Sequence, residues 1–186
     1  MKFQTNNQFV SADALLIDIS IPLQFNGPQP NAFGVNAGTS VSLGDTRTGS
    51  SVNFDSVTFV PHCNGTHTEC VGHITDERIS VRDCLQDVLM RAVLVSVEPE
   101  SIGGDMVVTR DLLASALSSV RRVLTNGRAT DTETSASLVV RTLPNHDGKL
   151  SRAYDETNIP PYFSAEAMEY MVECGFKHLL VDLPSV

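Results

Sequence analysis

Three short segments with apolar centres limit the folds open to this chain more than any other feature. They cover residues 90–98, 136–143 and 176–183. Each has the length of a strand, and none approaches the roughly 18 apolar residues that a membrane span requires. Continuous apolar runs of this length are typical of strands buried inside a layered domain. The sequence therefore predicts three buried strands in its second half.

Two amphipathic segments alternate with these runs and are predicted to be helices. The first covers residues 109–124, with Thr109 as its cap, and the second covers residues 164–174, with Ser164 as its cap and Gly175 at its end. The apolar residues of the first helix share one face: Leu112, Leu113, Ala116, Leu117, Val120 and Leu124. We expect that face to pack on the predicted strands.

The first half of the chain has strand patterns but no comparable helix. Residues 13–21 are predicted to be a strand, because Ile17, Ile19 and Ile21 alternate with polar residues before Pro22, and apolar residues alternate again over residues 51–60. The segment between them, residues 24–50, is rich in Gly, Asn, Pro, Ser and Thr and is predicted to be a long loop with a short strand at residues 40–43. Strands followed by helix–strand alternation predict a mixed α/β layered domain.

Length, charge and cysteine content limit the classes of protein to which this chain can belong. The chain has 186 residues and a formal net charge of -9. Its length suits a single domain over residues 1–186. The acidic balance disfavours nucleic acid and anionic membranes as partners, because both attract basic surfaces. The N-terminus lacks the apolar core of a signal peptide, and the four cysteines are too sparse for a disulfide framework. We therefore expect a cytoplasmic protein.

Residues 62–73 contain the candidate functional side chains. They contain three of the five histidines, His62, His67 and His73, with Glu69 among them. On an extended segment, residues two apart project to the same side, so His67 and Glu69 can converge on one ion. Imidazole and carboxylate together suit Zn, Mn or Fe, and three protein ligands leave a position open for water. A remaining histidine can carry a proton.

Other interpretations of the same residues stay open. Histidines in a loop can simply be solvated. A structural zinc site built from Cys63, His67, Cys70 and His73 is a second alternative, although its spacing is tighter than the usual separated ligand pairs. A nucleophilic Cys63 or Cys70 paired with a histidine is a third.

The segment from Gly65 to Glu69 with His73 resembles the signature His-x-Gly-Thr-His-x-Asp-x-Pro-x-His of a metal-dependent cyclase/hydrolase family. That family includes bacterial kynurenine formamidase, the arylformamidase of tryptophan catabolism, and isatin hydrolase. Flanking segments are similar as well and follow the family order: residues 16–23, 140–142, 163–167 and 181–186.

The resemblance implies a swivelling β/β/α fold and hydrolysis of a small acyl amide, formamide or lactam by a metal-activated water. It implies that His62, His67 and Glu69 are ligands of a divalent metal, Zn or Mn, and that His73 moves the proton. The long early loop places Phe33 where the family covers its substrate, so Phe33 is a candidate substrate-binding residue, the alternative being an aromatic side chain that fixes the loop to the core. Family members commonly form homodimers or homotetramers.

The chain departs from the family signature at several positions. One extra residue separates His62 from Gly65, so a local bulge is needed for His62 to reach the metal. Glu69 replaces the usual aspartate, and Val71 stands at the proline position. The family also continues beyond the segment that matches Val186, and this C-terminal portion supplies a further histidine and a glutamate. The resemblance therefore implies that this chain lacks that portion.

Three hypotheses follow. The first is a metal-dependent hydrolase of a C–N bond, and it is the one that the sequence favours. The second is a non-catalytic binding or structural protein that keeps the fold with an incomplete metal site. The third is a cysteine-dependent enzyme that uses Cys63 or Cys70.

Overall fold

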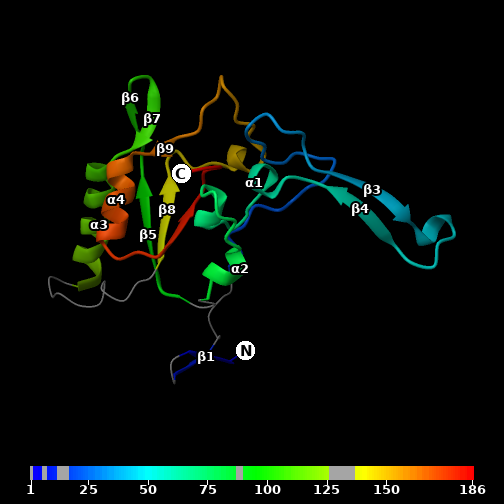
Figure 1. Ribbon diagram of the computed structural model, residues 1–186, viewed down its shortest axis with the longest axis horizontal. Helices are drawn as coiled ribbons and strands as arrows, with labels where there is room; N and C mark the ends of the chain where they lie inside the picture. Colours follow the sequence, from blue (N-terminus) through cyan, green and yellow to red (C-terminus); the bar gives the residue numbers. More distant parts are fainter. Residues whose placement is uncertain (1, 6–7, 12–16, 87–89, 126–136) are drawn as a thin grey trace.

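A parallel sheet forms the centre of the protein. The computed structural model describes residues 2–5, 8–11, 17–86, 90–125 and 137–186. Its central strands are β5 (Ala92–Val97), β8 (Ser137–Thr142) and β10 (His178–Val181), in the order β10-β8-β5 with both pairs parallel (Figure 1). The three apolar runs are therefore strands, as predicted, and the fold is mixed α/β.

Two helices cover one face of this sheet. They are α3 (Arg110–Thr125) and α4 (Ala165–Glu173), which lie side by side next to β5 (Figure 1). Both predicted caps are present: Thr109 Oγ1 accepts from the backbone N–H of Leu112 at 3.3 Å, and Ser164 Oγ accepts from that of Ala167 at 3.2 Å. Strands and helices enclose one core cluster: Val93, Val95, Val97, Val108, Leu113, Leu117, Leu138, Val140, Phe163, Ala167 and Met171.

Burial along β5 differs from the expectation of a fully buried strand. Val93, Val95 and Val97 are buried, whereas Leu94 between them is 56% exposed. The reason is that α3 and α4 pack on one face only, so alternate side chains of this edge strand point away from the helices. A continuous apolar run is thus compatible with a strand that is covered on a single side.

A second small sheet adjoins the helix N-termini. It consists of β6 (Glu100–Ile102), β7 (Asp105–Val108) and β9 (Tyr162–Phe163), with β6 antiparallel and β9 parallel to β7. Gly103 and Gly104 have φ values of 65° and 103°, which the tight turn between β6 and β7 requires. At the N-terminus, β1 (Lys2–Thr5) pairs antiparallel with β2 (Gln8–Ser11). Our sequence analysis predicted none of these five strands.

A long hairpin projects from the rest of the protein (Figure 1). Its strands are β3 (Thr39–Gly44) and β4 (Phe54–Thr58), which are antiparallel and confirm the strands predicted at residues 40–43 and 51–60. The 3-10 helix η1 (Thr46–Thr48) lies in the connection between them.

Four short helical turns complete the described elements. They are α1 (Pro61–Asn64), η2 (Val71–His73), α2 (Val81–Cys84) and η4 (Asp147–Ser151). In the described part of the chain, no helix is both long and apolar enough to cross a membrane.

The strand predicted over residues 13–21 is not present in its described part. Residues 13–16 lie outside the described residues, and residues 17–21 belong to no strand. Asp18 Oδ1 accepts from both the backbone N–H and the hydroxyl of Ser20, at 2.9 and 2.7 Å. Such a local side-chain turn competes with strand pairing, which explains why alternation alone was misleading here.

Candidate metal centre

His62 is positioned by the single turn of helix α1. Pro61 occupies the first helical position, where a missing N–H costs nothing. The side chain of Asn64 is fully buried, and its Oδ1 accepts from the backbone N–H of Val60 at 2.7 Å while its Nδ2 donates to the carbonyl of Asn36 at 3.2 Å. These two bonds fix the turn at both ends, and the turn carries His62 toward His67.

The extended segment that follows α1 positions His67. Gly65 has φ 178°, an ordinary extended conformation, but a Cβ there would lie 2.6 Å from the side chain of Leu23. A side chain at this position would therefore force Leu23 to move, so close packing rather than the dihedral angles favours glycine here. The next residue, Thr66, accepts from the backbone N–H of Ile21 through its hydroxyl at 2.8 Å. Both contacts hold the segment against residues 21–23.

A hydrogen bond sets the tautomer of His67. Its Nδ1 lies 3.0 Å from the carbonyl oxygen of Gly65. A carbonyl can only accept, so Nδ1 carries the proton, and in the neutral ring Nε2 presents its lone pair. An imidazole held in this way is the form that ligates metals, with its second nitrogen fixed by a backbone carbonyl.

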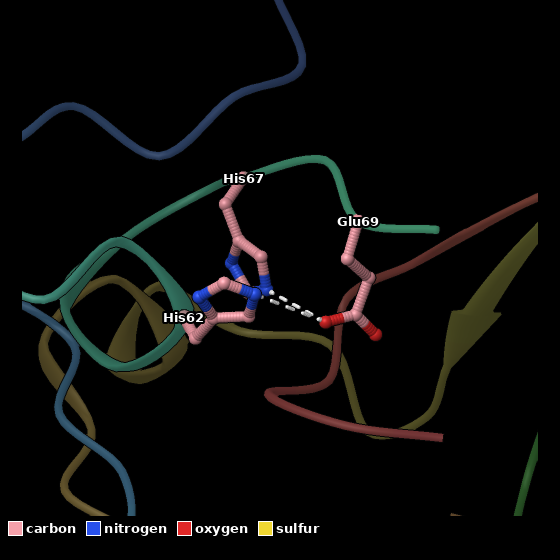
Figure 2. A group of neighbouring side chains, drawn as sticks. All are labelled: His62, His67 and Glu69. Carbon is pink, nitrogen blue, oxygen red and sulfur yellow. Dashed lines mark ion pairs between the residues drawn. The ribbon is translucent and has the colours of Figure 1, made fainter. Parts of the chain in front are cut away.

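The three imidazoles of the segment surround one carboxylate oxygen. Glu69 Oε2 lies 3.6 Å from Nε2 of His62, 3.6 Å from Nε2 of His67 and 3.7 Å from Nε2 of His73. Figure 2 shows the side chains of His62 and His67 pointing toward the Glu69 carboxylate. These separations are too long for good hydrogen bonds. The ring nitrogens and the carboxylate oxygen instead lie around a common point.

The spacing of His62, His67 and Glu69 fits a metal ion. One ligand atom from each lies within 4.8 Å of the others. Ligand atoms about 2.1 Å from a tetrahedral ion stand about 3.4 Å apart, close to the separations found here. Two imidazoles and one carboxylate suit Zn²⁺ or Mn²⁺ and leave a coordination position open. The His62–His67–Glu69 group can therefore hold a divalent metal.

His73 lies at the edge of this group. It is the last residue of η2, and its ring stacks on that of His62 with centroids 4.4 Å apart and planes at 13°. Its side chain is 49% exposed, against 19% for His67. The structure thus brings together all four residues that the sequence singled out in this segment, with His73 nearest to solvent.

The cysteines offer little to a nucleophilic mechanism. Partial burial raises the pKa of the Cys63 thiol, which disfavours the thiolate that such a mechanism needs. Cys70 donates to the carbonyl oxygen of Ile79 at 3.3 Å. Both observations weigh against the third hypothesis.

Phe33 lies close to helix α1 but is not enclosed. The backbone N–H of its neighbour Ala32 donates to the carbonyl of Cys63 at 3.1 Å, which ties this loop to the turn that carries His62. Phe33 itself has φ 59°, a left-handed conformation that is unfavourable for a bulky residue, and its side chain is 63% exposed. Its role in substrate binding stays a prediction.

The remaining histidines lie outside the cluster. His146 caps η4, accepting from the backbone N–H of Gly148 at 3.1 Å, and it is exposed as expected for a residue of this turn. His178 begins β10 and is half-buried.

Two supporting residues escaped the sequence analysis. Asn64 and Thr66 hold the backbone on either side of Gly65, yet neither carries a charge nor ligates a metal. Thr66 belongs to the Gly-Thr-His part of the family signature, but its partner Ile21 and the Asn36 partner of Asn64 lie far away in the chain, so no local pattern marks these supporting roles. The available signal in the sequence was the spacing of Pro61 and Asn64, which are one helical turn apart.

Comparison with known proteins places the chain in a family. No curated protein matches it. A protein-family model described as "Putative cyclase" matches residues 17–186, which is nearly the whole chain and includes every residue of the candidate metal centre. The match agrees with the resemblance carried by residues 65–73. The chain therefore belongs to the cyclase family.

Proposed function

We propose that this protein is a metal-dependent hydrolase that cleaves a C–N bond in a small acyl amide, formamide or lactam, as an arylformamidase does. The observation that carries the proposal is the convergence of three imidazole Nε2 atoms on one oxygen of Glu69. The cyclase family match supports an enzyme of this kind.

The ligand set consists of His62, His67 and Glu69, and the proposed ion is Zn²⁺ or Mn²⁺. These three residues would hold the ion, which would supply activation of a water for attack on the carbonyl carbon and stabilisation of the negative charge on the carbonyl oxygen. The formal charge of -9 on the chain favours the approach of a cation.

Each residue of the centre has a distinct task in this proposal. His67 offers Nε2 because the carbonyl of Gly65 holds its Nδ1 proton. Glu69 supplies the negative charge that offsets part of the charge of the ion. His73, exposed and stacked on His62, accepts a proton at Nε2 from the attacking water and returns it to the departing nitrogen.

Metal analysis combined with a hydrolysis assay tests the proposal. Wild-type protein, His67→Ala and the control His146→Ala are loaded with Zn²⁺ or Mn²⁺, dialysed and assayed on formanilide and isatin. We expect stoichiometric metal and hydrolysis of one probe in the wild type and in His146→Ala, and the loss of both in His67→Ala.

Two results would contradict the proposal. A wild-type protein that retains no metal, together with hydrolysis that survives His67→Ala, would exclude metal-dependent catalysis. Stoichiometric metal without hydrolysis of either an aryl formamide or a lactam would favour the alternative, a non-catalytic binding protein that retains the fold.

A further inference from the structure

The loop that follows Glu69 folds back on itself and carries His73 in its first turn. The backbone N–H of His73 donates to the carbonyl of Cys70 at 2.9 Å, and Ile74 donates in the same way one residue further on, which completes the turn η2. A turn of three residues does not keep its own direction, because so few hydrogen bonds do not offset the cost of forming it. The direction of the His73 side chain therefore depends on what η2 packs against.

The backbone of Ile79 packs directly on η2 at Gly72. A Cβ built on Gly72 would lie 2.7 Å from the nitrogen of Ile79 and 2.9 Å from its carbonyl carbon, both of them backbone atoms. Backbone atoms cannot turn aside as the end of a side chain can, so any side chain at residue 72 would push the two segments apart. The φ angle of Gly72 is not positive, so its conformation does not demand glycine. Close contact with Ile79 is thus what the glycine permits.

Two further contacts close the same loop. The thiol of Cys70 donates to the carbonyl oxygen of Ile79 at 3.3 Å. The hydroxyl of Thr75 donates to the carbonyl of Glu77 at 2.8 Å and lies 3.2 Å from that of Val71. The ends of η2 are thus tied to the chain that returns to it at Ile79.

This packing decides where the ring of His73 lies. The ring stacks on that of His62, with centroids 4.4 Å apart and planes at 13°, and its Nε2 lies 3.7 Å from Oε2 of Glu69. His62 and His67 are held by other contacts, through α1 and through the extended segment that follows it. A displacement of η2 would therefore move His73 away from two imidazoles that stay in place.

We propose that Gly72 is a positioning residue for His73. It lets the backbone of Ile79 lie against η2, and the loop closed in this way fixes the turn so that the His73 ring stacks on His62 with its Nε2 beside Glu69. The consequence for catalysis rests on the proposed function, in which His73 carries the proton. Where no such contact exists and the dihedral angles allow it, alanine in place of glycine is stabilising. At residue 72 we expect the opposite.

Nuclear Overhauser effects in the metal-free full chain test the stacking. Rings stacked at 4.4 Å bring protons of His62 and His73 close enough for a cross-peak, which we expect in the wild type and not in Gly72→Ala. Gly27→Ala is the matched control and should keep the cross-peak, because a Cβ there would meet only ordinary contacts of 3.5 and 3.6 Å. A wild type without the cross-peak, or a folded Gly72→Ala that retains it at full strength, would overturn the proposal.

Kinetics at full zinc occupancy test the consequence for catalysis. In Gly72→Ala we expect kcat to fall about 10–100-fold, a part of what acid–base catalysis contributes, with KM unchanged and stoichiometric Zn²⁺ retained. Unchanged kcat would overturn the proposal, as would the loss of zinc, which would assign Gly72 to the metal ligands rather than to His73. If the wild type hydrolyses no probe, the proposed function fails, and the ring cross-peak still decides the placement of His73.

A second variant decides the matter if Gly72→Ala does not fold. Thr75→Val has nearly the same shape but cannot donate to Glu77, so the loop loses one of its closing contacts while Gly72 stays. We expect a weaker cross-peak between His62 and His73 and a several-fold lower kcat. A cross-peak and a kcat equal to those of the wild type would overturn the proposal.

Discussion

Asn64 shows how a residue outside the ligand set shapes the centre. Its buried amide joins Val60, at the start of the helical turn, to Asn36 in the early loop. Removal of the side chain leaves the backbone N–H of Val60 and the carbonyl of Asn36 without these partners. Each such loss inside a protein is costly, and here it also loosens the turn that carries His62.

We expect Asn64→Ala to lower the free energy of unfolding by about 1–3 kcal/mol, the cost of buried polar groups left unsatisfied. We also expect weaker Zn²⁺ binding, because His62 is no longer held in place. Urea unfolding and a Zn²⁺ titration measure the two effects. Asn145→Ala, at an exposed position, is the control and should change neither. Full stability and full affinity in Asn64→Ala would refute this role.

Glu69 stands where the cyclase family signature has aspartate. The observed separations, 3.6 and 3.7 Å from its Oε2 to the three Nε2 atoms, depend on the length of its side chain. Removal of one methylene withdraws the carboxylate by about 1.5 Å, the length of a C–C bond.

We therefore expect Glu69→Asp to bind Zn²⁺ about 10–100-fold more weakly, the range for disturbed metal sites. Isothermal titration calorimetry gives the affinities, with Glu77→Asp on the exposed loop as the control. Tighter binding by Glu69→Asp would mean that the geometry around Glu69 is not the one that holds the ion.

The sequence predicted part of this centre and missed part. His67 and Glu69 were predictable because their i, i+2 spacing on an extended segment decides the direction of both side chains. The position of the His62 side chain was not predictable, because it depends on a helical turn that Asn64 fixes through its hydrogen bond to the distant Asn36. The family signature identified His62 as a candidate ligand, and the structure shows the helical turn that brings its side chain to Glu69.

At the scale of elements, a polar cluster joins the ends of β8 and β10. Asp182 accepts from the backbone N–H and the hydroxyl of Thr142, at 3.0 and 2.9 Å. Lys149 donates to Asp182 at 2.6 Å and to the hydroxyl of Thr142 at 2.7 Å, and its side chain is only 10% exposed. A charge so enclosed is costly if its partner is removed.

We expect Asp182→Ala to destabilise the protein by about 1–3 kcal/mol, because it leaves Lys149 and Thr142 without a hydrogen-bond partner in a partly buried site. Lys149→Met should cost less when Asp182→Asn accompanies it than when it is made alone, because the double variant leaves no unpaired charge. Urea unfolding of the single and double variants measures this coupling. Strictly additive losses would show that the two charges act separately.

Elements were predictable where apolar pattern and caps agreed, as in α3, α4 and the three strands of the central sheet. They were not predictable where local chemistry prevailed. Asp18 and Ser20 form a turn inside an alternating pattern, and the hairpin of β6 and β7 depends on two glycines between short strands. The apolar pattern alone indicates neither the competing side-chain hydrogen bond nor the strand with which a segment pairs.

At the scale of the whole molecule, the projecting β3–β4 hairpin exposes apolar side chains. Five of them are at least 48% exposed: Val41, Leu43, Val52, Phe54 and Val57. Exposed apolar side chains that gather on one projecting element are typical of an interface. We predict a homodimer in which the hairpin of each copy packs on the other copy, in line with the oligomers implied by the family resemblance.

A double substitution tests this assembly. Val41 and Leu43 are both exposed on β3, so Val41→Lys with Leu43→Lys places two charges in the predicted interface. We expect light scattering after size exclusion to show a dimer for the wild type and for the control Ser51→Lys, and a monomer for the double variant. A monomeric wild type would contradict the prediction, as would a dimer that survives both lysines.

The central claim is that His62, His67 and Glu69 share one metal ion. A crystal structure of the Zn²⁺-soaked protein, with anomalous data collected at the zinc edge, tests it most directly. We predict one strong anomalous peak about 2.0–2.2 Å from Nε2 of His62, Nε2 of His67 and a carboxylate oxygen of Glu69. An empty centre, or a peak held by the cysteines or by other residues, would contradict the account.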